Sequence, residues 1–383
     1  MSRTIFIIGG TGAQGLPIIR SLVQDPSPYT VRILTRDPSS RRAQSLAALS
    51  PQKVHLQKGT FTSEADLRAG FTGAWGAFVN IDGFATGEAM ETYWTIRCFE
   101  IAIECGVQMY VHGNLDYVYK LAGYDPALRC GHYDGKGRMG EWILLQRQQQ
   151  QQQQSGVGQN GKGMRAALFT TGPYIEMALA PHTPMEPFIE NDSEGGQVLV
   201  WKVPLSESGG VAHVALDDCG PYVRWLFDNP ARADGMDLAV AIGSVSYSEM
   251  ASAFEKVTGH KARYEEITLD AFFALPNWAR VADRPTGYMV TDPNSPAVMS
   301  MRDNFSGFWR MWQASGGNDG LIRRDYKLLD EIHPGRIKSA EEFFRREDEK
   351  TRKDGRGGLW EVVLSKTPVL KVHEDRGRAP QSR

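Results

Sequence analysis

The N-terminal half of the chain alternates short apolar runs with longer stretches in which apolar residues recur every three or four positions. The short runs are rich in β-branched residues and predict strands at Ile5–Ile8, Val31–Thr35, Val54–Gln57, Ala77–Asn80 and Met109–His112. The longer stretches predict helices at Leu16–Gln24, Ala43–Ala48, Glu64–Ala69 and Tyr93–Cys105. Strands that alternate with helices are joined by right-handed crossovers, so we predict an α/β fold with a Rossmann-type, doubly wound parallel sheet.

A low-complexity insert interrupts this rhythm after a predicted helix at Gly137–Gln146. It spans residues 146–163, contains the unbroken glutamine run Gln148–Gln154, and is followed by a predicted strand at Met164–Phe169. A segment of glutamine, glycine and serine cannot bury a core, so we expect a flexible surface loop here.

After Thr170 the pattern changes, because short strands and helices mix without the earlier alternation. We therefore expect a Rossmann domain at residues 1–180 and a smaller mixed α/β domain, which covers the substrate or a partner site, at 181–345. The chain from about Phe343 carries many charges of both signs, and we expect an exposed helix there, followed by a flexible tail within residues 346–383.

Composition narrows the functional classes. The chain has 383 residues, is 41% hydrophobic and has a formal net charge of −2, so it lacks the basic field of a nucleic-acid or membrane-surface protein. No apolar run has the length of a membrane helix, and the N-terminus lacks a signal-peptide pattern. The four cysteines form no CxxC pair and the histidines show no metal-ligand spacing. We expect a cytoplasmic protein with reduced thiols, no metal and no direct contact with nucleic acid.

A glycine-rich turn follows the first predicted strand and opens the first predicted helix. Gly9–Gly15 fits the pattern GxxGxxG, in which glycines allow a tight turn and a close approach of the backbone to a pyrophosphate. The helix that follows presents free N–H groups to that phosphate. The turn therefore predicts a dinucleotide site at Gly10, Thr11, Gly12, Ala13, Gln14 and Gly15.

The end of the second strand indicates which dinucleotide is bound. An NAD site places an acidic residue there, whereas this chain has Arg36, whose planar fork of donors suits a 2′-phosphate. Asp37 follows one residue late, and the turn continues through Pro38, Ser39 and Ser40. We predict NADP, with a solvated strand-end arginine as the alternative for Arg36.

Three motifs together resemble a known family. "GGTGAQG", "TRDPSS" and "HYDGKG", in this order and spacing, are similar to those of NmrA-like proteins, which are atypical relatives of the short-chain dehydrogenase/reductases. The resemblance implies further cofactor contacts at Gly59, Thr60, Asn80, Ile81, Asp82, Lys136, Pro173, Tyr174, Ile175 and Glu176. Two positions depart from the pattern: Thr60 stands where relatives usually have aspartate, and Met177 follows Glu176 where they have asparagine.

The usual catalytic residues of such reductases are incomplete here. A short-chain reductase uses Tyr-x-x-x-Lys and an upstream serine, and this chain aligns His132 with the tyrosine and Lys136 with the lysine. Tyr133 is the next residue, and Gly113 and Asn114 stand where the serine is expected. The unperturbed histidine pKa of about 6.5 suits proton transfer near neutral pH. Lys136, His132 and Tyr133 are therefore the catalytic candidates, with a structural histidine as the alternative for His132.

One stripe of aromatic residues remains. Phe305, Phe308, Trp309 and Trp312 share one helix face, which indicates either core packing or an aromatic wall for a hydrophobic substrate or partner.

The resemblance allows two functions, because some NmrA-like proteins are reductases and others bind NAD(P) and regulate partners such as transcription factors. We favour an NADPH-dependent oxidoreductase that reduces a small hydrophobic carbonyl, enone or imine, in keeping with secondary metabolism. The alternative is a redox sensor that binds NADP(H) and a protein partner without turnover. The missing serine and tyrosine favour the sensor, whereas the aromatic stripe and the loop at Pro173–Glu176 favour the enzyme.

Overall fold

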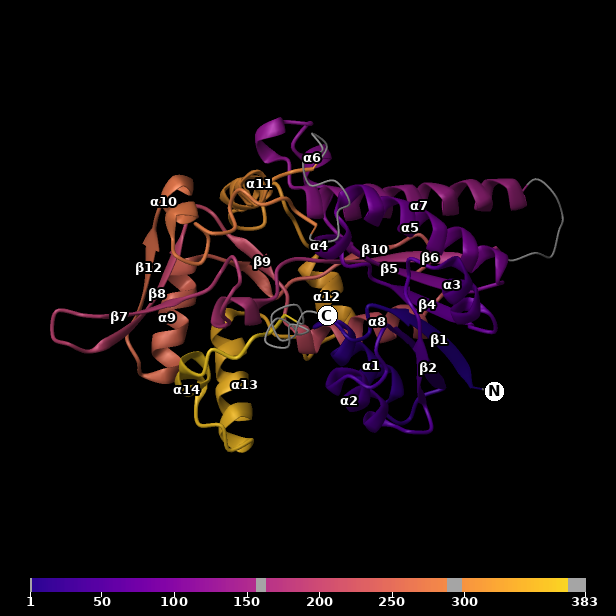
Figure 1. The fold of residues 1–383 in the computed structure, drawn as a ribbon, viewed down its shortest axis with the longest axis horizontal. Coiled ribbons are helices and arrows are strands. Elements are labelled where there is room, and N and C mark those ends of the chain that lie inside the picture. The colour runs from indigo at the N-terminus through magenta and orange to yellow at the C-terminus, as the bar shows by residue number, and fades with distance from the viewer. Residues whose placement is uncertain (1, 156–162, 288–297, 371–383) are drawn as a thin grey trace, which may run out of the picture.

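A seven-stranded parallel sheet organises the larger part of the molecule (Figure 1). The computed structural model describes residues 2–155, 163–287 and 298–370. The strand order is β10-β6-β5-β4-β1-β2-β3. These strands are β1 (Arg3–Ile8), β2 (Tyr29–Thr35), β3 (Val54–Lys58), β4 (Gly76–Val79), β5 (Met109–Leu115), β6 (Arg165–Thr171) and β10 (Asp237–Ala239).

Helices cover both faces of this sheet, as the alternation of apolar residues along β1 requires. Ile5 and Ile7 pack against one set of helices, and Phe6 and Ile8 pack against the other. The first set is α1 (Gly15–Val23), α2 (Arg41–Leu49) and α8 (Leu216–Asp228); the second is α3 (Glu64–Phe71), α5 (Glu88–Glu104) and α7 (Gly131–Ser155). This arrangement confirms the predicted doubly wound α/β fold.

The strand order reverses between β1 and β4. From β1 the chain proceeds to β2 and β3 on one side, then returns to build β4, β5 and β6 on the other side. In open parallel sheets, the carboxyl ends of the strands at such a reversal form the ligand crevice. The loops that follow β1, β2, β4 and β5 are therefore where a site is expected.

A smaller mixed unit lies beside the large sheet, at the left of Figure 1. Its strands are β7 (Phe188–Asn191), β8 (Gln197–Val203), β9 (Val211–His213), β11 (Gly243–Val245) and β12 (Ala262–Glu266). Its helices are α9 (Tyr247–Thr258), α10 (Leu269–Ala274), α11 (Met301–Gln313), α13 (Ala340–Lys353) and α14 (Leu359–Leu364). A separate core holds the unit together, with Trp201, Trp309 and Trp312 fully buried.

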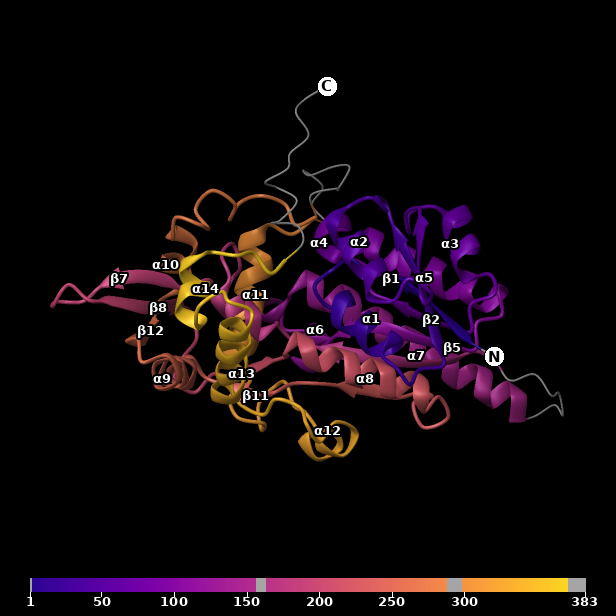
Figure 2. The same cartoon turned by 90° about the horizontal axis from the view of Figure 1, so that it is seen from below.

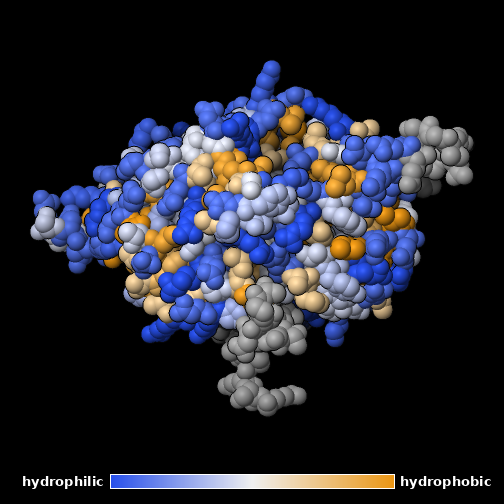
Figure 3. Space-filling model, turned by 90° about the horizontal axis from the view of Figure 1, so that it is seen from above, coloured by the Kyte–Doolittle hydropathy of each residue, from blue (hydrophilic) through white to orange (hydrophobic). Residues whose placement is uncertain are grey.

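Three short α-helices and two 3₁₀ helices complete the described chain: α4 (Gly83–Thr86), α6 (Val118–Leu121), α12 (Tyr326–Ile332), η1 (Pro126–Leu128) and η2 (Ile175–Leu179). No helix among the described residues combines the length and apolar character needed to cross a membrane. Figure 3 shows that the apolar areas on one face of the surface are small and separated by hydrophilic residues.

The chain returns to the large sheet after residue 180. Helix α8 packs against α1 (Figure 2). Strand β10 pairs with β6 at the edge of the sheet (Figure 1). A division of the chain at residue 180 therefore leaves one helix and one strand of the larger unit beyond the boundary.

The glutamine run differs from the expected loop. Helix α7 continues through it and ends at Ser155, and Figure 1 shows this helix extending past the sheet. Arg147 and Gln151 both donate to the carboxylate of Asp234 and hold this part of the helix. Glutamine is a good helix former, so a composition that cannot build a core can still extend a helix that has already begun. Residues 156–162 lie outside the described residues.

The predicted tail is also folded over much of its length. Helices α13 and α14 bury Phe343, Phe344 and Trp360 in the core of the smaller unit, and Trp360 stacks on His260 at 4.2 Å between ring centroids. A helix is present where one was expected, but its apolar face is buried, and α14 follows it where a flexible tail was expected, because the charges lie on one side of amphipathic helices. Residues 371–383 lie outside the described residues.

Candidate functional site

The loop between β1 and α1 is built around close backbone contacts. Gly9 has φ of 87°, and the Gly12 N–H donates to the Gly9 carbonyl at 2.9 Å. A Cβ at Gly9 would lie 2.4 Å from the Asn80 carbonyl oxygen, and one at Gly15 would lie 2.2 Å from the Gly10 carbonyl oxygen. The loop thus forms a cradle that side chains would fill, and it leads into the N-terminus of α1, which fits a pyrophosphate.

The turn after β2 leaves Arg36 available. Arg36 is exposed and makes no hydrogen bond or ion pair within the described part of the chain. The Asp37 carboxylate accepts from the Ser39 N–H at 2.9 Å, and Ser40 caps α2 by accepting from the Ala43 N–H. Asp37, Ser39 and Ser40 therefore shape the turn, and Arg36 is the group free to meet a phosphate.

The turn after β3 lies next to this one. The Gly59 N–H donates to the Thr35 carbonyl at 3.0 Å, and the Thr60 N–H donates to the carboxylate of Asp66 at 3.0 Å. Although the usual aspartate is replaced by Thr60, α3 supplies a carboxylate to the same turn. Gly59 and Thr60 therefore form a turn beside the one after β2, and the Asp66 carboxylate holds this turn by accepting from the Thr60 N–H.

A chain of polar contacts runs from the glycine loop to Lys136. The Asn80 amide donates to Gln14 Oε1 at 2.8 Å. Lys136 Nζ donates to Asn80 Oδ1 at 3.1 Å and to the Ile81 carbonyl at 2.6 Å, and it lies 2.7 Å from Glu91 Oε1. The structure thus brings together Gln14, Asn80, Ile81 and Lys136 from three separate motifs, at the reversal point of the sheet.

Glu91 is a member of this network that the sequence reasoning missed. It is 1% exposed on α5, where burial raises its pKa and the Lys136 ammonium counteracts that rise. The signal was present, because Glu91 shares the buried stripe of α5 with Trp94, Thr95 and Cys98. An acid at a position spaced for the core requires a buried partner.

His132 is held in a ring of aromatic side chains. Its imidazole lies 4.6 Å from Phe84 and 5.6 Å from Phe305, measured between ring centroids. His132 Nδ1 lies 3.0 Å from Asn304 Oδ1, which as an amide oxygen accepts a proton donated by the ring. Burial lowers the pKa of His132 to about 4. The imidazole is therefore neutral near pH 7, in contrast to the near-neutral pKa expected from the sequence.

Tyr133 does not join the Lys136 network. It is 2% exposed within the core of the smaller unit, with its ring 6.2 Å from Phe308 and 6.3 Å from Trp312. Burial raises the pKa of its hydroxyl well above the usual range. The geometry gives Tyr133 a packing role.

The residues at the position of the missing serine are also structural. The Asn114 amide nitrogen donates to Thr170 Oγ1 at 2.8 Å. The amide oxygen of Asn114 lies against Gly140, where a Cβ would come within 2.6 Å of that oxygen. Gly113 leaves room for Asn80, because a Cβ there would lie 2.7 Å from Asn80 Cβ. Asn114 therefore faces the sheet and α7.

The loop Pro173–Glu176 is tied to neighbouring elements. The Ile175 N–H donates to the Val214 carbonyl at 3.0 Å, and Glu176 Oε1 accepts from the Leu216 N–H at 2.9 Å at the start of α8. Burial raises the pKa of Glu176 to about 8. Tyr174 is half-buried between these anchors, whereas Asp82 is exposed and caps α4 by accepting from the Phe84 N–H.

The aromatic stripe is core, with one edge at the site. Phe305, Phe308, Trp309 and Trp312 are each at most 4% exposed on α11. Phe305 also stacks on Phe84, which is 39% exposed. The stripe therefore fulfils the packing alternative, and Phe305 links it to His132 and to the partly exposed ring of Phe84.

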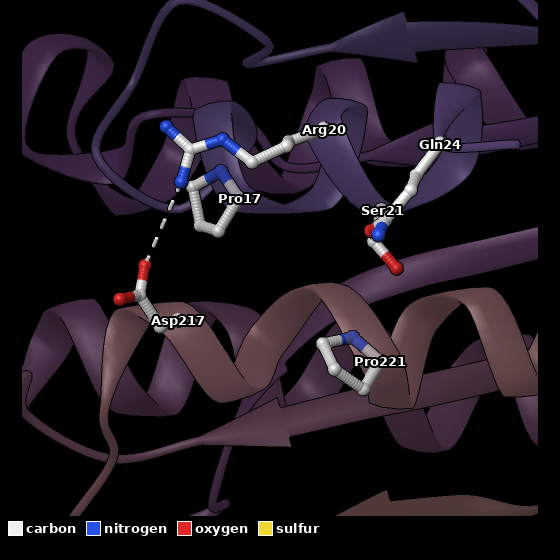
Figure 4. Close-up of a pocket in the computed structure, with 6 residues that line it drawn as sticks. All are labelled: Pro17, Arg20, Ser21, Gln24, Asp217 and Pro221. Carbon is white, nitrogen blue, oxygen red and sulfur yellow. Dashed lines mark ion pairs between the residues drawn. The ribbon is translucent and has the colours of Figure 1, made fainter.

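Two pockets lie elsewhere. One pocket, of about 170 Å³, lies between α1 and α8 (Figure 4). It is lined by Pro17, Arg20, Ser21, Gln24, Asp217 and Pro221. Its charged pair, Arg20 and Asp217, is 4.0 Å apart and half-exposed, which suits a surface contact between helices. The other pocket lies beside α7, and its lining includes Lys120, Glu141 and Arg147. Each of these three side chains forms an ion pair.

Comparisons with known proteins agree with this architecture. The model described as the NmrA-like family matches residues 1–143 and 162–283, and the unmatched stretch between them contains the glutamine run. An NmrA-like family domain-containing oxidoreductase of Penicillium ochrochloron is 27% identical over 292 residues, which cover 72% of this chain and 77% of the relative.

Solved structures share the fold at low sequence identity. NmrA, described as a negative transcriptional regulator and solved in complex with NAD, superposes with a TM-score of 0.64 at 16% identity, covering 94% of this chain and 99% of NmrA. The triphenylmethane reductase of Citrobacter sp., solved with NADP(H), gives a TM-score of 0.58 at 12% identity, covering 88% and 96% of the two chains.

Proposed function

The chain belongs to the NmrA-like family, and from this premise we propose that it is an NADPH-dependent oxidoreductase. The observation that carries the proposal is the continuous polar contact from the glycine loop through Gln14 and Asn80 to Lys136. A dinucleotide whose pyrophosphate lies in the loop would cross the sheet at β1 and β4, so its reactive end would reach Lys136.

The choice of NADP rests on Arg36. It is exposed at the end of β2 and free of other bonds in the described chain, where a guanidinium favours a 2′-phosphate. The Asp37 carboxylate is engaged with Ser39 and is poorly placed to hold ribose hydroxyls.

The reaction class follows from the surroundings of His132 and Tyr133, the two candidates at the place of the usual acid. NADPH supplies a hydride, and a simple ketone then needs a proton at its oxygen as the hydride arrives. The neutral imidazole of His132 and the buried hydroxyl of Tyr133 supply that proton poorly. Conjugated or cationic acceptors, such as enones and imines that bind in their protonated iminium form, need less help, because hydride attack gives a delocalised enolate or a neutral amine. We propose these as the substrate class.

The surroundings suit a small hydrophobic substrate. Phe84, His132 and Phe305 present stacked rings beside the lysine network, and Phe84 is accessible from outside. Aromatic side chains of this kind bind flat apolar molecules through area and ring geometry.

The test is single-turnover oxidation of enzyme-bound NADPH by a panel of enones, imines and simple ketones. We expect enones or imines to oxidise NADPH and simple ketones of the same size to react at least tenfold more slowly. Tight NADPH binding without oxidation by any acceptor would overturn the enzyme.

The second candidate is a redox sensor that binds NADP(H) and a protein partner. The specific observation in its favour is that neither His132 nor Tyr133 is poised to donate a proton. In that case partner binding, rather than turnover, would respond to the oxidation state of the nucleotide.

A further inference from the structure

The carboxylate of Glu91 is a buried charged group to which the proposed function gives no role. It comes from α5, a different helix from the one that carries Lys136, and it is 1% exposed. Burying a carboxylate is costly unless it is paired, so its place beside the lysine needs an explanation.

The surrounding backbone makes room for this carboxylate. A Cβ on Gly83 would lie 2.2 Å from Glu91 Oε2, and a Cβ on Gly135 would lie 3.3 Å from the same oxygen. These glycines belong to α4 and α7, so two further elements are shaped around one acid. Glu91 is thus seated firmly between helices.

The other carboxylate nearby serves different partners. Glu88, one turn earlier on α5, pairs with Arg129 and Arg138. Among the described residues, Glu91 is the carboxylate paired with the Lys136 ammonium, at 2.7 Å. The remaining contacts of the ammonium, Asn80 Oδ1 and the Ile81 carbonyl, carry no net charge.

Charge compensation matters at this point because the two forms of the cofactor differ in charge. The nicotinamide ring is cationic in NADP⁺ and neutral in NADPH. An uncompensated ammonium would repel the oxidised ring and leave the reduced ring almost unaffected. A carboxylate in contact with the ammonium reduces that difference.

We propose that Glu91 is a positioning residue that holds Lys136 and cancels its charge, so that the site binds NADP⁺ and NADPH with similar affinity. This inference rests on the proposed function, since it requires the nicotinamide to lie at the Lys136 end. It assigns to Glu91 the control of product release, because a site that repels NADP⁺ less also retains it longer after hydride transfer.

The test compares the dissociation constants of NADP⁺ and NADPH for wild type, Glu91→Gln and the double variant Glu91→Gln/Lys136→Met. Glu91→Gln keeps the shape of the side chain and removes its charge. We expect the ratio of the NADP⁺ to the NADPH constant to rise roughly tenfold in the single variant. The double variant is neutral again, so its ratio should return to within about threefold of wild type, while both affinities fall.

Glu100→Gln is the matched control, because Glu100 lies on the same helix and pairs with Arg97 instead. It should leave the ratio unchanged. If Glu91→Gln does not fold, Lys136→Met gives the reverse test at pH 8.5, where an unbalanced carboxylate should favour NADP⁺. An unchanged ratio in Glu91→Gln, or in Lys136→Met where only that variant folds, would overturn the inference. If wild type binds neither nucleotide, the proposed function fails instead.

Discussion

The two ends of the candidate site are built in different ways. At the glycine loop the geometry is local, since Gly9, Gly12 and Gly15 contact each other or the neighbouring strand end through backbone atoms. At the lysine end, Lys136, Glu91 and Asn80 come from α7, α5 and the end of β4, and they meet through side chains. A side chain added at the loop glycines would collide with backbone atoms. At the lysine end, a substitution can remove a single side-chain contact and leave the others in place.

This difference explains how a family can keep a nucleotide and vary its chemistry. The loop that would hold the pyrophosphate depends on small residues whose replacement causes backbone collisions. At the lysine end, His132 stands where the usual tyrosine is expected, and Lys136 pairs with the buried Glu91.

The glycine loop should show the largest effect of any single substitution. In Gly15→Ala the new Cβ would lie 2.2 Å from the Gly10 carbonyl oxygen, so the backbone must move. We expect NADPH affinity to fall at least 100-fold, measured by fluorescence titration. Gly335→Ala is the control, since its Cβ would meet nothing closer than 3.7 Å. Unchanged binding in Gly15→Ala would separate the loop from the cofactor.

Substitution of Lys136 should lower the stability of the folded protein and make that stability depend on pH. Lys136→Met leaves Glu91 buried without its counter-charge, which we expect to destabilise the protein by about 3 kcal/mol near neutral pH. The pKa of Glu91 is already raised by burial, and losing the ammonium raises it further. The folded state then favours the protonated acid, so stability is retained below the unfolded pKa of about 4.3 and falls as pH rises through the higher folded value.

Denaturant unfolding of Lys136→Met and wild type at pH 5 and pH 8 measures this effect. The deficit of the variant should be smaller at pH 5 than at pH 8. Adding Glu91→Gln should remove that pH dependence, and a deficit equal at both pH values would show that Glu91 does not carry it.

Arg36 tests the specificity of the loop end. Arg36→Asp replaces an exposed cation with an anion, so we expect NADP affinity to fall roughly 10- to 100-fold and NAD affinity to change less than threefold. Titration of both nucleotides against the same variant is internally controlled. An equal loss for NADP and NAD would mean that Arg36 does not meet the 2′-phosphate.

His132 should have a smaller effect on turnover than a general acid. His132→Asn keeps a donor for Asn304 and removes the imidazole, and we expect the rate of hydride transfer to fall less than tenfold, below the 10²–10⁴ typical of an acid. Because the pKa of His132 is lowered to about 4, the pH–rate profile of wild type should show no histidine limb between pH 5.5 and 7.5. A limb there that the variant loses would restore His132 as the acid.

The glutamine segment should matter least. Deleting Gln148–Gly158 removes the contact of Gln151 with Asp234 but leaves the paired Arg147 in place. We expect less than 1 kcal/mol of change in stability and unchanged NADPH affinity. A larger loss in either would show that the end of α7 supports the sheet.

The same contrast between local and long-range contacts explains what the sequence predicted. The strands, the glycine loop and the position of Lys136 follow from periodicity and motifs, and the structure bears out the sheet they imply. The sequence did not predict Glu91 as a site residue, because its partner Lys136 lies on another helix. The neutrality of His132 depends on rings from α4 and α11, which are remote in sequence. The glutamine run was predicted to be a loop because its composition cannot form a core. Composition does not tell whether a helix that has already begun continues through such a run.

The most direct test of the account follows the hydride itself. NADPH deuterated at the transferring position of C4 is mixed with excess enzyme and an enone or imine selected from the panel, and the product is analysed by mass spectrometry. The account predicts a product one mass unit heavier, formed in wild type and in His132→Asn and lost in Gly15→Ala. Absence of deuterium from every product, with NADPH bound and intact, would contradict the reductase and leave the nucleotide as a sensed ligand.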